Sequence, residues 1–388
     1  MITVSFLTKL RYNMFQINLT SRRISMTDEY MRYANQKKNQ KLFELEDLYQ
    51  NQFDTYAPVF QKHFQSICET IRSMQNNGEL GELSYLEYTL LYTNLIHAEH
   101  TAQVRAYDNR WYFDPHQRII GSFDLSPFFF KYKELWADLM SCRKRFAGAV
   151  TAQETLAYLL SCAASFFQYI TAAFRFSILP CIKAEPFLSL RRADAFEINV
   201  GEYMAFTEAI YKENRMRSSQ KTLDWFALRL EFAYAYESFC GLDLTNADLS
   251  EIDLRYADLS HAALEGTDFQ DALLYGTRFC HANLRNADFR YSQLYEADFT
   301  GADLTNANFR AAEGYRGVPD HTDWFIPGYR SICFKNADLS RADFTRTKIR
   351  DADFTGATMN GTILERRTAA HFALSDSQRR AVQIIDRS

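Results

Sequence analysis

The sequence predicts two architectures in one chain: an α-helical domain over residues 27–240 and a β-solenoid over residues 241–364. In the first region apolar residues such as Leu42 and Leu45 recur at spacings of three and four, which is the helix period. From Leu244 onward a Leu or Phe stands at almost every fifth position, and Ala usually stands two places before it. A fixed short period indicates stacked coils, in which each unit buries its apolar side against its neighbours.

The composition is that of a soluble globular protein large enough for two domains. The 388 residues are 47% hydrophobic and 24% charged, and the net charge is −4. That charge is too small to indicate a polyanion or a membrane surface as partner. Residues 1–240 hold 27 basic and 26 acidic side chains, so we do not expect direct nucleic-acid binding.

The cysteines and the N-terminus favour a cytoplasmic protein. Seven cysteines are odd in number and form no C-x-x-C pair, which is typical of free thiols in a reducing compartment. Lys9 and Arg11 interrupt the apolar residues near the N-terminus, so we expect no signal peptide. Residues 1–26 alternate only weakly and are predicted to be a short strand or disordered.

Helix-start signals divide the region 27–240 into about seven segments. Capping boxes are read at Ser84 with Glu87 and at Thr151 with Glu154, and Ser126 is followed by a proline at the first helical position. Residues 111–123 look irregular or strand-like. We predict an otherwise all-helical domain.

Residues 156–174 must be weighed as a membrane span because they are 19 residues without a charge. Against a span, Gln168 lies in mid-segment, Ser and Ala are frequent, and the capping box before it is typical of soluble helices. A buried core helix is the preferred interpretation, and a membrane partner is not expected.

The five-residue unit resembles the pentapeptide-repeat family. The motif Ala-(Asp/Asn)-(Leu/Phe)-x-x covers residues 240–364, as in the segment HANLRNADFRYSQLYEADFTGADLTNANF that begins at His281. The resemblance implies a right-handed quadrilateral β-helix, in which four pentapeptides form one coil and each makes one side. The helical region resembles no family that we recognise.

The central residues alternate Leu and Phe from Leu264 to Phe309, so with four sides per coil residues 20 apart should stack. Residues 310–333 lack the motif. The Phe ladders continue past this insertion only if it contains one side of the coil that lacks the motif, which we call the hidden side. We predict a loop at 310–326 and a hidden side centred on Tyr329. The predicted core ladders contain Phe269, Phe279, Phe289, Phe299, Phe309, Tyr329, Phe334, Phe344 and Phe354.

Both ends of a solenoid need covers, because they expose unpaired backbone. A helix at residues 222–240 is predicted to cover the first coil. Within the tail at 365–388, Ser375 and Gln378 form a capping box that opens a short last helix. Its apolar face of Ala381, Val382 and Ile385 is predicted either to fold over the final coil or to form a homodimer contact, as the resemblance implies for some members.

The sequence contains little that indicates catalysis. There is no phosphate-binding glycine loop and no Cys with an obvious catalytic partner, and no cofactor is expected. His97 and His100 have a spacing that metal sites use, but a site needs further ligands, for which Glu87 and Glu99 are the candidates, so the two histidines are only weak candidates. An unrecognised enzyme or ligand-binding activity in the helical domain stays open.

We therefore predict a non-enzymatic scaffold that presents the solenoid surface and its loop to a protein partner. The resemblance implies an alternative, protection of DNA gyrase or topoisomerase. DNA mimicry is weakened, because Arg and Lys interrupt the acids of the solenoid: 19 acidic and 12 basic side chains lie in 241–364. Exposed aromatic and Arg side chains favour the loop as the partner site. Its candidate residues are Tyr315, Arg316, His321, Asp323, Trp324 and Phe325.

Overall fold

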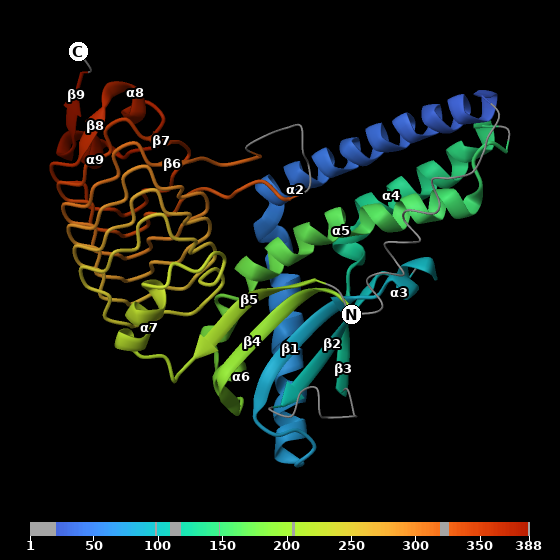
Figure 1. Cartoon of the computed structure of the whole chain (residues 1–388), viewed down its shortest axis with the longest axis horizontal. Helices are drawn as coiled ribbons and strands as arrows, with labels where there is room; N and C mark the ends of the chain where they lie inside the picture. The colour runs from blue at the N-terminus through green and yellow to red at the C-terminus, as the bar shows by residue number, and fades with distance from the viewer. Residues whose placement is uncertain are drawn as a thin grey trace.

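The computed structural model describes residues 21–97, 99–108, 118–146, 148–203, 206–318 and 326–386. An N-terminal domain of long helices and a twisted sheet stands beside a ladder of stacked coils, and a loop from the coils reaches helix α2 (Figure 1). The prediction for residues 1–26 falls outside the described residues up to residue 20. From Ser21 the chain is already helical.

The helices of the N-terminal domain are dominated by α2 (Ser21–Asn76), which changes direction along its length (Figure 1). Pro58 lies inside α2; it has no N–H for the bond to the preceding turn, and this is the usual cause of such a bend. α2 packs against α4 (Ser126–Cys142), α5 (Ala152–Ser177) and the sheet. The shorter helices are α3 (Tyr92–Ile96) and α6 (Glu185–Leu188), with 3₁₀ turns at Arg143–Phe146 and Cys181–Lys183.

The five-stranded sheet corrects the all-helical prediction for 27–240. Its strands are β1 (Leu83–Leu90), β2 (Thr101–Asp108), β3 (Arg118–Asp124), β4 (Arg192–Glu202) and β5 (Thr207–Asn214). The order is β3-β2-β1-β4-β5, with β1 and β4 parallel and the other pairs antiparallel. Ser84 and Glu87, read as a capping box, lie within β1. There Leu86, Tyr88 and Leu90 alternate inward, a period of two that outweighs the short capping motif.

Helix α5 begins where the sequence predicts, since Thr151 and Glu154 form the complete capping box. Among the described residues, the helical stretch Ala152–Lys183 is the one long and apolar enough to cross a membrane. Its 18-residue apolar segment has a mean hydropathy of 1.4, and 56% of that segment is buried. Phe166, Ile170 and Phe174 of α5 lie in the aromatic core of the domain. This burial fits the core-helix interpretation.

The coils of the solenoid repeat every 20 residues, as four pentapeptides per turn require. Parallel bridges join Asp268 to Asp288, Leu273 to Gln293 and equivalent positions along the ladder. Two Phe ladders stack ring on ring through the centre: Phe269, Phe289, Phe309 and Phe344 form one, and Phe279, Phe299, Phe334 and Phe354 form the other. Leu residues centre the two remaining sides.

We name the four sides by their centres and by whether they face the N-terminal domain. The inner Phe side is centred on Phe279, Phe299, Phe334 and Phe354, and the inner Leu side on Leu254, Leu274, Leu294 and Ile349. The outer Phe side is centred on Phe269, Phe289, Phe309 and Phe344, and the outer Leu side on Leu264, Leu284, Leu304 and Leu339.

A side is hidden in the insertion, but its centre is Gly314 and not Tyr329. β6 (Glu313–Gly314) pairs in parallel with β7 (Lys348–Ile349), and the loop runs from 315 to 329 instead of 310–326. Ile332 fills the space left by the missing side chain, because its Cδ1 lies 2.7 Å from where a Cβ on Gly314 would stand. Tyr329 packs outside the coil, on the rings of Tyr275 and Tyr295.

The covers of the solenoid differ from the predicted ones in extent. Helix α7 (Ser219–Phe226) is shorter than 222–240, and the coil already begins where Ser238 bridges Asp258. Phe226 still closes the core, with its ring 4.9 Å from that of Phe239.

At the other end, α8 (Arg366–Ala369) and α9 (Asp376–Ala381) follow β8 (Ile363–Glu365), and Phe372 covers Phe354. Val382 and Ile385 are not on a helix face: β9 (Gln383–Ile385) pairs in parallel with β8 and adds one more side to the stack. The predicted helical face of Ala381, Val382 and Ile385 therefore does not form, because the chain resumes the coil direction after one short helix.

Candidate functional site

The described residues of the predicted partner loop contact the rest of the chain. The ring of Tyr315 lies 5.0 Å from that of Tyr295, edge to face, on the outside of the inner Leu side. Arg316 donates from Nε to Oε1 of Gln50 at 2.9 Å and from a terminal nitrogen to Oδ1 of Asn51 at 3.0 Å. The remaining predicted residues His321, Asp323, Trp324 and Phe325 lie outside the described residues.

Both stems of the loop are fastened to α2. Glu46 is buried and accepts a hydrogen bond from the backbone N–H of Gly328 at 2.9 Å and another from the hydroxyl of Tyr169 at 3.0 Å. Gln50 donates to the backbone oxygens of Gly328 and Tyr329. Hydrogen bonds to a buried charged acceptor are among the stronger ones, so the loop is a strap between the two domains.

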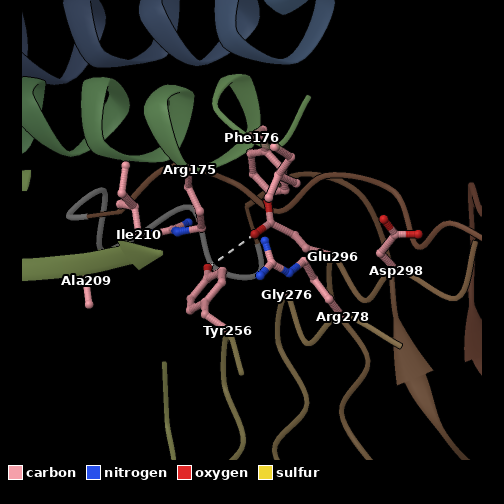
Figure 2. Close-up of a pocket in the computed structure, with 10 residues that line it drawn as sticks. Arg175, Phe176, Ala209, Ile210, Tyr256, Gly276, Arg278, Glu296 and Asp298 are labelled. Carbon is pink, nitrogen blue, oxygen red and sulfur yellow. Dashed lines mark hydrogen bonds between the residues drawn. The ribbon is translucent and has the colours of Figure 1, made fainter. Parts of the chain in front are cut away.

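A cluster of charged side chains lies where α5 meets the solenoid. Arg175, in the last turn of α5, forms an ion pair with Glu208 of β5, and its guanidinium lies 3.8 Å from the ring centre of Tyr256. Tyr256 donates to Oε2 of Glu296 at 3.2 Å (Figure 2). Glu296 is buried, and burial raises the pKa of its carboxyl above the usual range.

A glycine in the solenoid makes this cluster fit. Tyr256, Gly276 and Glu296 occupy the same corner of three successive coils, between the inner Leu and inner Phe sides. A Cβ on Gly276 would lie 2.3 Å from the ring of Tyr256, so only glycine lets that ring fold across the middle coil towards Glu296 (Figure 2). The sequence signal was a Gly where the neighbouring coils carry large side chains.

Beside this cluster a polar cleft of about 340 Å³ opens between the domains. The guanidinium of Arg330 lies against two phenyl rings, 4.3 Å from the centre of Phe53 in α2 and 4.9 Å from that of Phe176 in α5. Its backbone N–H donates to Oε1 of Glu296 at 2.7 Å. The lining is completed by Gln50, Asp298, Arg316, Ser331, Cys333, Lys335 and Asp353.

The weak metal candidates do not come together. His97 follows the end of α3, and His100 lies beyond it against the rings of Phe129 and Tyr132, so the two are not one helical turn apart. No group of three or more His, Cys, Asp or Glu side chains that could hold a metal ion occurs within the described ranges. The geometry therefore gives no support to a metal centre at these histidines.

The outer Phe and outer Leu sides face away from the N-terminal domain (Figure 1). Their aspartates accept the backbone N–H two residues on, as Asp268 does from Gln270 at 2.8 Å, so these carboxylates brace the coil turns. Several are also paired with arginines, Asp288 with Arg290 and Asp303 with Arg285. The outer sides therefore carry acidic and basic side chains that are paired with one another.

Comparison with known proteins identifies the repeats of the coils. A model of pentapeptide repeats matches eight copies, over residues 238–271, 272–310 and 334–366. No curated protein sequence matches the chain.

Three solved structures illustrate the similarity. The pentapeptide repeat protein Rfr23 of the cyanobacterium Cyanothece 51142 is 18% identical, over 36% of this chain and 99% of its own, with a TM-score of 0.26. HetL of Nostoc sp. PCC 7120, a protein of heterocyst differentiation regulation, is 23% identical, over 34% and 76%, with a TM-score of 0.14. QnrB1, a plasmid-mediated fluoroquinolone resistance protein, is 17% identical, over 39% and 90%, with a TM-score of 0.20. The repeat motif, the 20-residue bridges and the family match agree, and residues 238–366 of this chain belong to the pentapeptide-repeat family.

Proposed function

We propose that this protein is a non-enzymatic interaction protein in which the N-terminal domain holds the solenoid and leaves its outer Phe and outer Leu sides to bind a protein partner. The observation that carries this proposal is the distribution of the interdomain contacts. Among the described residues they fall on the first coil, the inner sides and the loop stems, as with Lys212 to Glu237 and Arg316 to Gln50.

The chemistry of the outer sides favours a protein over a nucleic acid. A nucleic-acid surface needs clustered positive charge, whereas here Arg285 and Arg290 are each paired with an aspartate. Rows of short polar side chains on a rigid backbone lose little entropy on binding, which suits a protein interface of moderate size. Seven free thiols support a reducing compartment, and we propose the cytoplasm.

The strap changes the expectation for the loop. Tyr315 and Arg316, predicted to meet a partner, are instead committed to Tyr295 and α2. A partner that needed them would first have to break these contacts. Gyrase protection stays a prediction, and purified gyrase is one of the partners to be tried.

The test is site-specific photo-cross-linking in the source cell. A benzophenone amino acid is placed at Arg310 on the outer Phe side, and at the exposed Lys62 of α2 as the comparison site. We expect one protein to cross-link from Arg310 and not from Lys62, and to bind the purified chain. The variant Arg290→Glu/Arg310→Glu should then weaken that binding at least tenfold. The same partner cross-linking from Lys62 alone would move the binding site to the N-terminal domain and refute the proposal.

A further inference from the structure

The cleft between the domains contains charges of both signs that are not paired with one another. Six ionisable side chains line it: Glu296, Asp298, Asp353, Arg316, Arg330 and Lys335. Only Lys335 and Asp353 form an ion pair, with 3.1 Å between Nζ and Oδ2. Among the described residues, the remaining two cations and two acids form no ion pair, although Arg175 and Arg330 act on Glu296 through space.

The cations are positioned by groups that do not neutralise them. Arg330 packs against the rings of Phe53 and Phe176, and within the described part of the chain its guanidinium has neither a hydrogen bond nor an ion pair. Arg316 is bonded to amide and carbonyl oxygens of Gln50 and Asn51. Stacking on aromatic faces orients a guanidinium and leaves its N–H edge open, which is how proteins present Arg to a carboxylate.

The acids are likewise held without a cation in contact. Oδ1 of Asp298 accepts from the backbone N–H of Thr300 at 2.9 Å and from its hydroxyl at 2.5 Å, and its carboxylate also meets the thiol of Cys280. Glu296 is fixed from both sides by the Arg330 N–H and the Tyr256 hydroxyl. A desolvated charge without a counter-charge is costly, so a cleft with separate open cationic and anionic groups is suited to a ligand that supplies both partners.

We infer that the cleft binds a small zwitterion of the amino-acid class, with its carboxylate on Arg330 and its ammonium group on Asp298. A simple anion would meet the two acids, and a simple cation would meet the two arginines, so neither alone suits the lining. The volume of about 340 Å³ is at the lower end of small-molecule sites, and Phe176 offers an apolar wall for the carbon chain between the charges.

Such a ligand would contact both domains. Phe176 belongs to α5 and Gln50 to α2, whereas Asp298 and Lys335 belong to the inner Phe side of the solenoid. Binding would therefore strengthen the union of the two domains by mass action, since an undocked solenoid offers only half of the site. This inference is independent of the outer-side partner proposed above.

The experiment uses the full chain and four ω-amino acids: glycine, β-alanine, γ-aminobutyrate and ε-aminocaproate. In this series the number of carbons between the ammonium group and the carboxylate increases, so the best binder indicates the distance between the two charged groups of the site. Acetate and ethylammonium at equal ionic strength serve as single-charge probes. We expect one or two members of the series to raise Tm by about 2 °C at ten times Kd. Calorimetric titration then gives Kd, and the single-charge probes should have no such effect.

Two conservative variants test the assignment of each charge. Arg330→Gln removes the guanidinium charge, and Asp298→Asn keeps the Oδ1 that braces the turn; each should weaken binding of the best probe at least tenfold. The matched controls are Asp338→Asn, whose Oδ1 makes the same turn contact with the N–H of Ser340 on the outer Leu side, and Arg341→Gln, which is exposed. Both controls should bind as the wild type does.

Three results would overturn the inference. The first is that no member of the series shifts Tm at tens of millimolar. The second is that acetate shifts it as far as the best zwitterion, which would reduce the site to an anion site. The third is that binding is unchanged in both cleft variants, which would place the ligand elsewhere.

Discussion

The two domains bury similar side chains in different ways. In the solenoid each central Phe meets the same residue of the coil above and below, with ring centres 4.9 Å apart and planes nearly parallel, as in Phe269, Phe289 and Phe309. In the N-terminal domain Phe60 meets Phe123, Phe128 and Phe174, from three other elements and at three different angles.

This difference separates local from global stability. Each coil contacts only its two neighbours. The free energy of unfolding of a solenoid is therefore close to the sum of the contributions of its coils and of the interfaces between them. The N-terminal core joins α2, α4, α5 and the sheet in one cluster and is expected to unfold as one unit. The two domains are connected by the strap and by the cluster of charged side chains around Arg175, Tyr256 and Glu296, which we call the charged corner.

The largest effect should come from breaking a ladder. Phe289→Ala removes a ring that is fully buried between two stacked neighbours, and the cavity should cost roughly 3–5 kcal/mol. Because the damage is local to adjoining coils, hydrogen exchange should rise over residues 265–315 and stay unchanged in the sheet. Phe60→Ala, the matched change in the other core, should raise exchange throughout the N-terminal domain. A uniform rise in both variants would mean that the molecule is one cooperative unit.

A second change tests the strap. Glu46→Ala leaves the N–H of Gly328 and the hydroxyl of Tyr169 without their buried acceptor, at a cost of roughly 3 kcal/mol. The two domains should then unfold in separate steps in a denaturant titration followed by circular dichroism.

The control for the strap is Asp47→Ala, one residue along α2. Among the described residues, exposed Asp47 accepts a hydrogen bond only from Asn51, and its loss should change stability by less than about 0.5 kcal/mol. If the two variants unfold alike, the strap is not what couples the domains.

The solenoid could be predicted from the sequence because its core residues recur at every fifth position. The Phe ladders and the existence of a hidden side followed from that period. The position of the hidden side did not, because Gly314 has no side chain to continue the pattern. Of the motif before it, Ala312 is kept and Glu313 replaces the usual Asp or Asn, and Ile332 stands where the next side would have Ala.

The N-terminal sheet and the interdomain site were not predictable in the same way. β1 has the alternation of a strand, but a capping-box pattern overlies it at Ser84, and two short-range signals disagreed. The strap joins residues as far apart as Glu46 and Gly328, 282 positions along the chain. Nothing periodic relates them, so only the packed fold brings them together.

Two glycine substitutions, at Gly276 and Gly241, test how closely the Tyr256 ring approaches the backbone at the charged corner. Gly276→Ala adds a methyl group at φ +61° that would meet the ring of Tyr256, and should cost roughly 2–3 kcal/mol. Gly241 has φ +70° with nothing within 4 Å, so Gly241→Ala should cost only the backbone term of about 1 kcal/mol. Ala311 already holds φ +60° at a comparable corner, which shows that the backbone tolerates a Cβ.

The measurement for this pair is the free energy of unfolding of each variant, together with the accessibility of Tyr256. Equal losses from the two glycines would contradict the close approach of the Tyr256 ring.

The smallest effect is a difference in pH response between the domains. Burial of His63 among the aromatic rings of the N-terminal core lowers the pKa of its imidazole to about 4, from an ordinary 6.5. Between these values the unfolded chain binds a proton that the folded domain does not, so lowering the pH favours unfolding. With allowance for the accessible part of the ring, the loss should be about 2 kcal/mol on going from pH 7 to pH 4.

The solenoid should respond later, since the titrating groups along its sides are aspartates. Burial opposes the shift in both cases, but Arg278 with the hydrogen bonds from Ser260 lowers the pKa of Asp258, and the hydrogen bonds from Thr355 with Lys335 lower the pKa of Asp353. A carboxyl with a lowered pKa supplies stability that is lost only as the pH falls below about 4. Domain-resolved hydrogen exchange at pH 7, 5 and 4 should therefore show the N-terminal domain loosening first. His63→Leu should remove that first step and leave the solenoid unchanged, because the leucine fills the same apolar site and has no proton to bind. If the step persists in the variant, the acid sensitivity of this domain resides in another group.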